Sequence, residues 1–591
     1  MITTHRLPEG AFTALASGGG DAAAVQYVRA AQHSKQIMLL HAIAEAAGDA
    51  DPASAAVIAF GAAYRLLAAI QATDQSAVTW LLGLPHLSGW AHDCLIHLDQ
   101  GLAPDFGYLA AAAASAAIRS RVQFELDVPV RDGRVLLPGL GCFSVATQHA
   151  WLRLRSDGER LQVGPLIDVR CAELTPEDGS AGPIPHWRGT VLVHAMADGQ
   201  PWDLLLETAD RYLDRYSLPM STALTAEEAA TWRRDIQAAW GLLVRHHGWA
   251  AGPVRDGVSV IVPLVPRSDA DMDSATSPAA FGAIAASRPP SPVIMAETLV
   301  HEFQHLKLSG LMDVVPLIDP CDEKVYAPWR QDPRPAGGLL QGIYAHVGVA
   351  RFWNVQRHVE TEADGILRAQ VLYERWRRTI ELATGTLLRT GCLTEAGVRF
   401  VEMLRDQGRI LESKPLPAQA MDIATEVALD HRLTWELRHT AIDAAGVAAL
   451  ARAYRRGEPF REQMLPGVRI EEDTRKTYST VRSRLLSMRY LEPGRFRQLC
   501  AAGVPGLSDA DALLVRGNAS EAAQEYRETI AAATDAQPDA WIGLALAISR
   551  LAGMSAQQAF ATQLPLLFDV HACLRDQGAD GDPLDLAAWV T

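Results

Sequence analysis

The chain has 591 residues, more than one compact hydrophobic core usually holds, so we expect several domains. Hydrophobic residues make up 49% and charged residues 21%, as in ordinary globular proteins, which excludes a disordered chain. The formal net charge is -15 and no dense run of Lys or Arg occurs, so nucleic acid is not expected as a partner.

Seven cysteines are scattered singly without a CxxC pair, so we expect neither a disulfide framework nor a thiolate zinc ribbon. The first residues run into a polar stretch and lack the apolar segment of a secretion signal. The apolar run from Leu109 to Ile118 is too short to cross a bilayer and predicts a buried helix. We therefore expect a cytoplasmic protein that does not insert into a membrane.

Residues 1–121 predict a helical region, because apolar residues recur there at helical spacing. Residues 122–215 predict a small antiparallel β unit, in which short β-rich runs alternate with turn signals such as Asp132-Gly133. Helical spacing resumes after Thr225, a predicted N-cap. A buried strand is predicted at 258–265, followed by a polar loop over 268–292 whose final prolines delay the next helix until about Val293.

We assign residues 216–430 to a metal-binding core around that helix and residues 431–591 to an all-α C-terminal region. Within the latter, residues 517–546 space small and aromatic side chains as in one tetratricopeptide-like hairpin. Two packed helices of an ordinary helical region would give the same pattern. The predicted fold class is α+β and predominantly helical.

The helix predicted to begin near Val293 carries the motif His301-Glu302-Phe303-Gln304-His305. Two histidines four residues apart project from the same face of a helix and can hold one metal ion, with Glu302 beside them as the catalytic candidate. The alternative is a buried helix whose histidines only form hydrogen bonds.

A third protein ligand is expected, because two imidazoles alone would hold an ion weakly. We favour His346, which lies close to the apolar side of a predicted helix; its other role would be that of a core histidine donating to a backbone carbonyl. Glu360, in a Glu360-x-x-x-Asp364 pattern, and Asp313, where the motif helix could end, are the remaining candidates.

A proline-rich loop over 329–335 carries Arg330 and Arg334. Guanidinium groups grip carboxylates in bidentate fashion, so these residues are candidates for binding an anionic co-substrate or a peptide carboxylate. At least one of them could instead pair with Asp332 or Asp313 and hold the loop.

Four segments together resemble the HEXXH-motif family of peptide-modification proteins. They are His301-Glu302-Phe303-Gln304-His305-x-Lys307-Leu308, Asp313-x-x-Pro316-Leu317, Pro328-Trp329-Arg330-x-Asp332-Pro333-Arg334-Pro335 and Gln341-Gly342-x-Tyr344-Ala345-His346. The family occurs alone or fused behind radical S-adenosylmethionine maturases. Because no CxxxCxxC cluster is present, the chain looks like the stand-alone form.

The resemblance implies an Fe(II) and 2-oxoglutarate-dependent oxygenase that hydroxylates a β-carbon in a ribosomally made precursor peptide, with a radical S-adenosylmethionine maturase as a partner protein. It implies two histidines and one carboxylate as metal ligands, so Glu360, Asp313 or Glu302 compete with His346 for the third place. Arg330 or Arg334 would hold the distal carboxylate of 2-oxoglutarate.

Two other functions fit the same residues. In a zinc peptidase, His301 and His305 would bind Zn and Glu302 would activate water. In a non-catalytic peptide-binding protein, the metal would be structural and the helical C-terminal region would bind the partner. The arginine loop favours the oxygenase, because a peptidase does not need two guanidinium groups near its metal.

Overall fold

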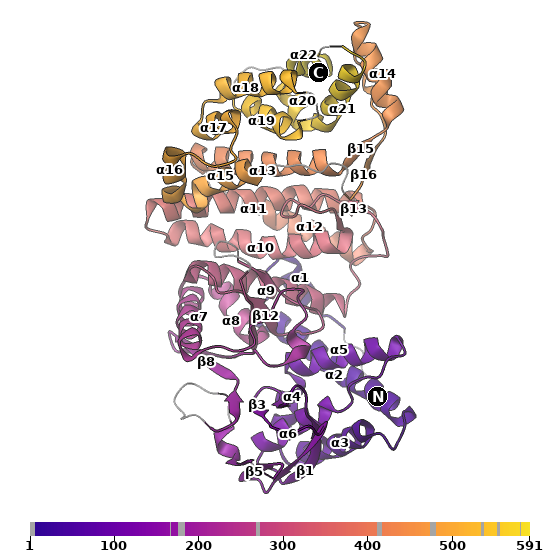
Figure 1. Ribbon diagram of the computed structural model, residues 1–591, viewed down its shortest axis with the longest axis vertical. Coiled ribbons are helices and arrows are strands. Elements are labelled where there is room, and N and C mark those ends of the chain that lie inside the picture. The colour runs from indigo at the N-terminus through magenta and orange to yellow at the C-terminus, as the bar shows by residue number, and fades with distance from the viewer. Residues whose placement is uncertain are drawn as a thin grey trace. The chain divides into compact units, whose positions relative to one another are not determined.

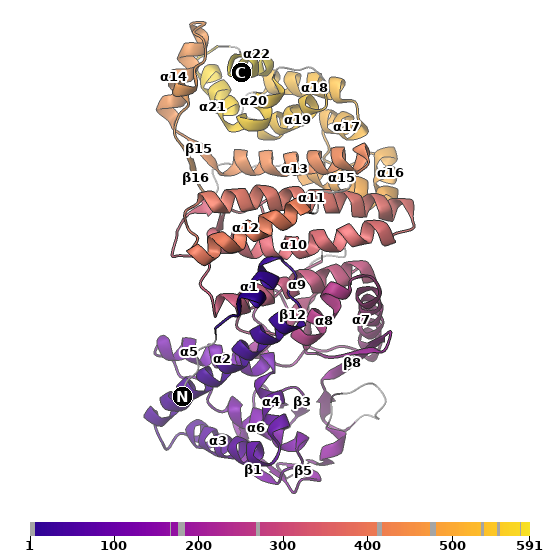
Figure 2. The same cartoon turned by 180° about the vertical axis from the view of Figure 1, so that it is seen from behind.

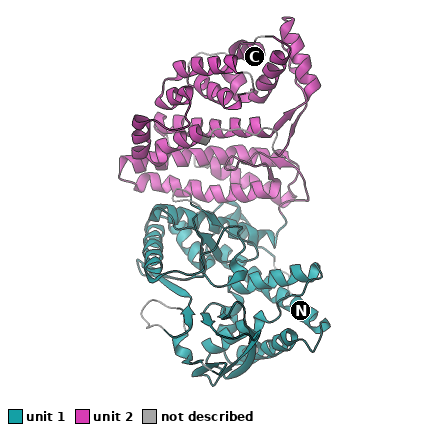
Figure 3. Cartoon of the chain, viewed as in Figure 1, with its two compact units in different colours: residues 1–316 teal, residues 317–591 magenta. Residues whose placement is uncertain are grey.

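The computed structural model describes residues 6–165, 167–174, 176, 184–266, 272–410, 416–472, 480–533, 537–551, 556–579 and 581–591. The chain folds into two compact units, residues 1–316 and 317–591 (Figure 3). Helices make up 60% of the structure and the sheets are small, which confirms the predicted α+β, predominantly helical class. The region 216–430, predicted as one metal-binding core, spans the boundary between the two units.

Unit 1 begins with six helices, of which the last is rich in alanine. They are α1 (Glu9–Ala16), α2 (Ala22–Asp49), α3 (Ala55–Thr73), α4 (Gln75–Leu82), α5 (Pro85–Asp99) and α6 (Tyr108–Arg119). α6 is the buried helix predicted from its apolar run, and its small side chains let it pack against both α3 and the strand that follows. α3 is long and apolar enough to cross a membrane by length and composition, but Phe60, Ala63 and Ile70 on one of its faces are buried in the same core as α6. One face of α3 therefore belongs to the core of unit 1.

Two antiparallel sheets follow. Their strands are β1 (Phe124–Pro129), β2 (Arg134–Leu137), β3 (Gly141–Ser144), β4 (Trp151–Ser156), β5 (Arg160–Val163), β6 (Ile167–Arg170) and β7 (Trp187–Gly189). One sheet has the order β1-β4-β5-β6 and the other β2-β3-β7. The predicted turn at Asp132-Gly133 is present, and both residues take positive φ, at 48° and 68°.

A third, mixed sheet supports the motif helix. Its strands are β8 (Val191–Ala197), β9 (Gln200–Leu206), β10 (Val260–Pro263), β11 (Ser274–Ala275) and β12 (Ala283–Ala286), in the order β11-β12-β10-β9-β8. β10 runs parallel to β9 and β12, whereas β11 is antiparallel and lies at the edge. The loop predicted over 268–292 is therefore wrong in part. β12 escaped prediction because its sequence, Ala-Ile-Ala-Ala, has neither β-branched enrichment nor alternating polarity.

Three helices complete unit 1: α7 (Ala226–His246), α8 (Gly248–Gly257) and α9 (Pro292–Met312). The predicted N-cap Thr225 is confirmed, because its hydroxyl accepts from Glu228 N and the Glu228 carboxylate accepts from Thr225 N. α9 carries the HExxH motif and packs against α2, α7 and α8 as well as β11 and β12 (Figures 1 and 2).

Unit 2 is mainly helical. Its elements are β13 (Lys324–Val325), β14 (Arg334–Pro335), α10 (Ala336–Val359), α11 (Ala363–Arg389), α12 (Glu395–Ile410), α13 (Ala418–His439), β15 (Thr440–Ile442), α14 (Ala444–Arg455), β16 (Val468–Ile470), α15 (Thr480–Leu491), α16 (Pro493–Ala502), α17 (Asp509–Arg516), α18 (Ala519–Ala532), α19 (Pro538–Ser549), α20 (Gln557–Thr562), α21 (Leu564–Asp576) and α22 (Pro583–Trp589). α11 packs on α10, α12 and α13 (Figure 1). The predicted helical hairpin over 517–546 corresponds to α18 and α19, where Gly543 leaves room for the ring of Tyr526.

Two of the scattered cysteines are joined. Cys321 and Cys392 form a disulfide across a sequence separation of 71 residues. The single, scattered placement of the cysteines did not predict this pairing. The backbone explains the pairing, because Asp319 N donates to Cys392 O and Ile318 forms a β-bridge with Leu393. Cys94, Cys142, Cys171, Cys500 and Cys573 are free thiols.

Candidate metal centre

Two half-buried histidines lie on one face of α9, a helix whose other residues are mostly buried. The helix starts sharply, because Ser291 Oγ accepts a hydrogen bond from Ile294 N at 3.3 Å and Pro292 occupies the first turn. His301 and His305 are half-buried, whereas the residues between them are buried. The accessible side of α9 is therefore the side that carries both imidazoles.

The two imidazoles converge. Nε2 of His301 lies 3.2 Å from Nε2 of His305, and the ring planes are inclined by 75°. In a metal site, two ligand nitrogens each lie about 2.1 Å from the ion. When the nitrogen–metal–nitrogen angle lies between the octahedral and the tetrahedral value, the two nitrogens are about 3.0–3.4 Å apart. The observed separation lies in this range, so the pair can hold one divalent ion. The same contact could also be a hydrogen bond between two neutral rings.

Glu302 is directed at the edge strand of the third sheet. Its Oε1 accepts a hydrogen bond from Ser274 Oγ of β11 at 2.7 Å, and only 3% of the residue is exposed. Burial raises the pKa of the Glu302 carboxyl, while the nearby His305 and the hydroxyls of Ser274 and Thr276 act in the opposite direction. The structure therefore orients the motif carboxylate with hydroxyl groups from β11 and from the residue that follows it.

Two further polar residues of the motif helix contact an N-terminal loop. Gln304 Nε2 donates to Gly18 O at 2.7 Å, and Lys307 Nζ donates to Gly19 O. Gly18 and Gly20 have φ of 75° and 80°, so this turn between α1 and α2 uses a backbone conformation that favours glycine. The loop therefore covers the buried face of α9, which is not the face that carries the two histidines.

We expect the Lys307→Met variant to lose about 1–3 kcal/mol of unfolding free energy, because the carbonyl of Gly19 would lose a buried charged donor. Lys307 is 2% exposed, so water cannot readily replace its ammonium. Urea denaturation of the purified variant measures the effect. Replacing the half-exposed Lys35 by methionine provides the control and should cost less than about 1 kcal/mol. Equal losses in both variants would contradict the assigned role.

Unit 1 does not complete a three-residue ligand set in its described part. No third His, Cys, Asp or Glu there places a ligand atom within 4.8 Å of both imidazole nitrogens. Asp313 accepts hydrogen bonds from Gln32 Nε2 and Lys35 Nζ, both at 2.8 Å. It also follows His305 by eight residues, which corresponds to about 12 Å along a helix. Asp313 therefore anchors the end of α9 to α2 and does not share an ion with the histidines.

His346, the favoured third ligand, lies in unit 2. Its ring packs between Trp329 and Trp376, with centroid distances of 4.6 and 4.3 Å. Nδ1 lies 2.8 Å from Gly342 O, so Nδ1 carries a proton; in the neutral imidazole, Nε2 then offers a lone pair. This tautomer suits a metal ligand, but a core histidine bonded to the preceding turn of its helix has the same contact. The assignment stays a prediction.

The other candidates in unit 2 have partners of their own. Glu360 Oε1 accepts from Gln356 Nε2 at 2.7 Å; it follows His346 by 14 residues, about 21 Å along α10, so the two cannot share an ion. Arg330 Nε and the Arg334 guanidinium both donate to Asp332, at 2.9 and 3.1 Å. The arginine loop is therefore a triplet with one net positive charge.

Ser274, Thr276 and the Gly18 to Gly20 loop were not identified as site residues from the sequence. The short apolar run at 283–286, shortly before the motif helix, is the one signal that could have indicated a strand in this loop, although it lacks alternating polarity. Searches of protein-family models and of curated proteins give no match to the chain.

Proposed function

We propose that the chain is a metal-dependent enzyme that modifies a peptide, and that its reaction is Fe(II) and 2-oxoglutarate-dependent hydroxylation of a β-carbon. The observation that carries the proposal is the convergence of His301 Nε2 and His305 Nε2 on the accessible side of a buried helix, 3.2 Å apart. The resemblance to peptide-modification proteins supports the choice of reaction. A cytoplasmic location, with a precursor peptide and a radical S-adenosylmethionine maturase as partners, belongs to the same proposal.

A peptide substrate is favoured by the position of β11. This strand pairs with β12 on one side, and no described strand pairs with its other side. An extended peptide adds to such an edge through main-chain hydrogen bonds. Because Ser274 of β11 contacts Glu302, which is adjacent to His301 in the motif, a peptide along β11 would pass beside the histidine pair.

The chain's own residues bind and orient the reactants in this scheme. His301 and His305 bind the ion, and His346 is the predicted third ligand. When bound, iron with 2-oxoglutarate and dioxygen supplies the oxidant for an unactivated C–H bond. Arg330 or Arg334 would grip the distal carboxylate of 2-oxoglutarate, because the single carboxylate of Asp332 neutralises only one of them. Glu302, whose carboxylate accepts a hydrogen bond from Ser274, would orient the polar groups beside the ion.

A zinc peptidase is the second candidate, and the placement of Glu302 favours it. Its buried carboxylate lies next to the histidine pair and contacts the edge strand where a peptide would bind, as required of a base that takes a proton from attacking water. In that case His301 and His305 hold Zn, and the arginine triplet serves only the loop.

One incubation series separates the two reactions. The purified protein, loaded with Fe(II), is mixed with 2-oxoglutarate and candidate peptides from short reading frames next to its gene, in air and without oxygen. We expect a product heavier by one oxygen atom, one succinate per product, and neither product without oxygen. Zinc should inhibit, because it binds the same ligands and does not change oxidation state. Peptide cleavage without dioxygen and 2-oxoglutarate would overturn the oxygenase proposal and establish the peptidase.

Titration of the metal-loaded protein with 2-oxoglutarate tests the arginine triplet. Arg330→Leu or Arg334→Leu should weaken 2-oxoglutarate binding by about 2 kcal/mol, as expected when a charge-assisted pair is lost. Arg389→Leu, on the exposed end of α11, is the matched control. Unchanged binding in both single variants and in the double variant would remove the triplet from the co-substrate site.

A further inference from the structure

Unit 2 contains a groove between α11 and α13. The cavity has a volume of about 310 Å³ and is lined by Arg375, Arg378, Thr379 and Leu382 of α11, by Thr425, Ala428, Leu429 and Arg432 of α13, and by Tyr326, Pro328 and Ala561. On each helix the lining residues recur at i, i+3, i+4 and i+7, so each helix presents one continuous face. We call this cavity the α11–α13 groove.

The groove has an excess of positive charge. None of its lining residues is acidic, whereas three are arginines. Arg378 pairs with Glu374 at 2.5 Å, and Arg432 lies 3.7 Å from Glu436. Arg375 differs, because no carboxylate among the described residues pairs with it.

The unpaired guanidinium is nevertheless held in place. Arg375 donates to the hydroxyl of Tyr490 at 3.0 Å and lies 4.7 Å from the centroid of the Trp376 ring. Such contacts orient the cation without neutralising it. The cationic group is therefore preorganised for an anion.

The charge is confined to one end. Burial and the Glu436 carboxylate raise the pKa of Tyr326, whereas Arg432 and Arg375 lower it. Burial lowers the pKa of His431 to about 4, and Arg375 acts in the same direction. These groups therefore lie together, and His431 adds no charge near neutral pH. Leu382 lies seven residues beyond Arg375, about 10 Å along α11, and its side chain is 45% exposed. The groove thus has a cationic end and an apolar end.

We propose that the α11–α13 groove binds a small amphipathic anion, with a carboxylate or phosphate head at Arg375 and Arg432 and an apolar body along Leu429 and Leu382. The proposal goes beyond the proposed function and does not depend on the metal centre. The volume is at the lower end of the range for small-molecule sites, which suits a ligand of aryl-carboxylate size.

Isothermal titration calorimetry on the full chain tests the proposal with four probes: 4-phenylbutyrate, 3-phenylpropyl phosphate, the neutral 4-phenylbutyramide and inorganic phosphate. We expect one or both amphipathic anions to bind at least tenfold more tightly than the neutral amide and than inorganic phosphate. A preference between the two anions identifies the head group. Equal affinity for the amide and the carboxylate, or no binding of either amphipathic anion, would overturn the proposal.

Variants locate the binding site. Arg375→Met should weaken binding of the preferred anion at least tenfold, and Ala428→Phe should do the same by filling the groove without changing its charge. Arg389→Met, on the same helix but outside the groove, should bind like the parent. Melting temperatures show whether each variant is folded, and the filled variant remains informative if Arg375→Met does not fold. Parent-like affinity in a folded Ala428→Phe variant would contradict the assignment.

Discussion

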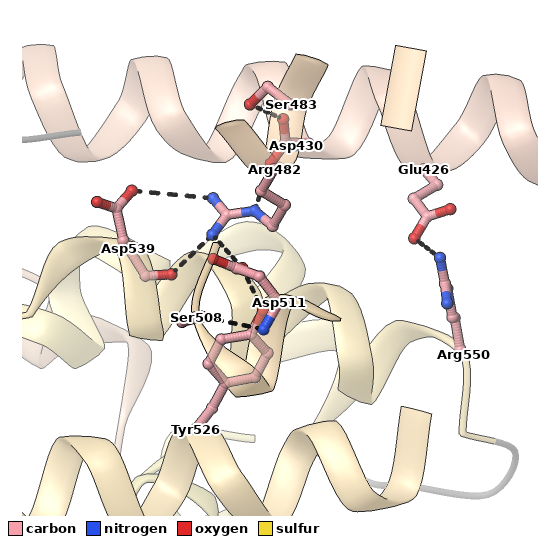
Figure 4. A network of polar contacts seen from close by, with 9 residues as sticks. All are labelled: Glu426, Asp430, Arg482, Ser483, Ser508, Asp511, Tyr526, Asp539 and Arg550. Atoms are coloured by element: carbon pink, nitrogen blue, oxygen red, sulfur yellow. Dashed lines mark hydrogen bonds and ion pairs between the residues drawn. The ribbon is translucent and has the colours of Figure 1, made fainter. Parts of the chain in front are cut away.

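Replacing Arg482 with methionine should lower the unfolding free energy of unit 2 by about 3–5 kcal/mol, the range typical when one partner of a buried ion pair is removed. Arg482 is 1% exposed and reaches from α15 to carboxylates on two other helices, Asp430 at 3.1 Å and Asp511 at 3.2 Å (Figure 4). It also donates to Asp539 O at 3.1 Å. Without the guanidinium, two carboxylates stay buried with no positive partner among the described residues.

Urea unfolding monitored by circular dichroism measures this loss. Arg495→Met is the matched control, because Arg495 pairs with Glu492 at 3.2 Å with both side chains half-exposed, and its loss should cost less than about 1 kcal/mol. The triple variant that also carries Asp430→Asn and Asp511→Asn should recover part of the stability, since it no longer buries unpaired charges. Similar stability of the Arg482 and Arg495 variants would show that the network contributes little.

The His301→Ala and His305→Ala variants should each bind Fe(II) or Zn(II) at least a hundredfold more weakly than the parent, more than the 10–100-fold that an outer contact costs. Each variant removes one of two nitrogens that lie 3.2 Å apart. Competition against a chelating dye, with metal content of the dialysed protein, gives the affinities. His41→Ala, on an exposed part of α2, is the control.

The double variant provides the strongest form of this test. If it retains one equivalent of metal with parental affinity, the metal centre lies elsewhere in the chain. His346→Ala examines the third ligand separately: a loss of affinity comparable to that of His301→Ala would support its role, whereas parental affinity would leave it as a core histidine bonded to Gly342.

The sequence predicted those parts of the fold whose signal is local. Thr225 was identified as an N-cap because the pattern Thr-x-x-Glu lies within one turn, and α6 because its apolar run is continuous. α9 starts one residue before the predicted Val293, since Pro292 suits the first helical position. Each of these features depends on residues close together in the chain.

Features that depend on distant pairings were not predictable. Ser274 is 28 residues from Glu302, and only the antiparallel pairing of β11 with β12 brings its hydroxyl to the carboxylate. Cys321 and Cys392 carry no spacing signal across 71 residues. The histidine pair was identified because its geometry comes from one helix, whereas the third ligand needs tertiary contacts that a motif does not encode.

The contact between the Gly18 loop and α9 also has a consequence for how the protein is made. Gly18 and Gln304 are separated by 286 residues. At about 5–20 residues per second, a ribosome reaches Gln304 about 15–60 s after Gly18. During that interval Val28, which packs against Gly310 in the finished fold, has no partner on α9. Nascent chains shorter than about 310 residues should therefore expose an apolar face of α2 to chaperones, and unit 1 can complete its fold only after the helix that carries the HExxH motif has been synthesised.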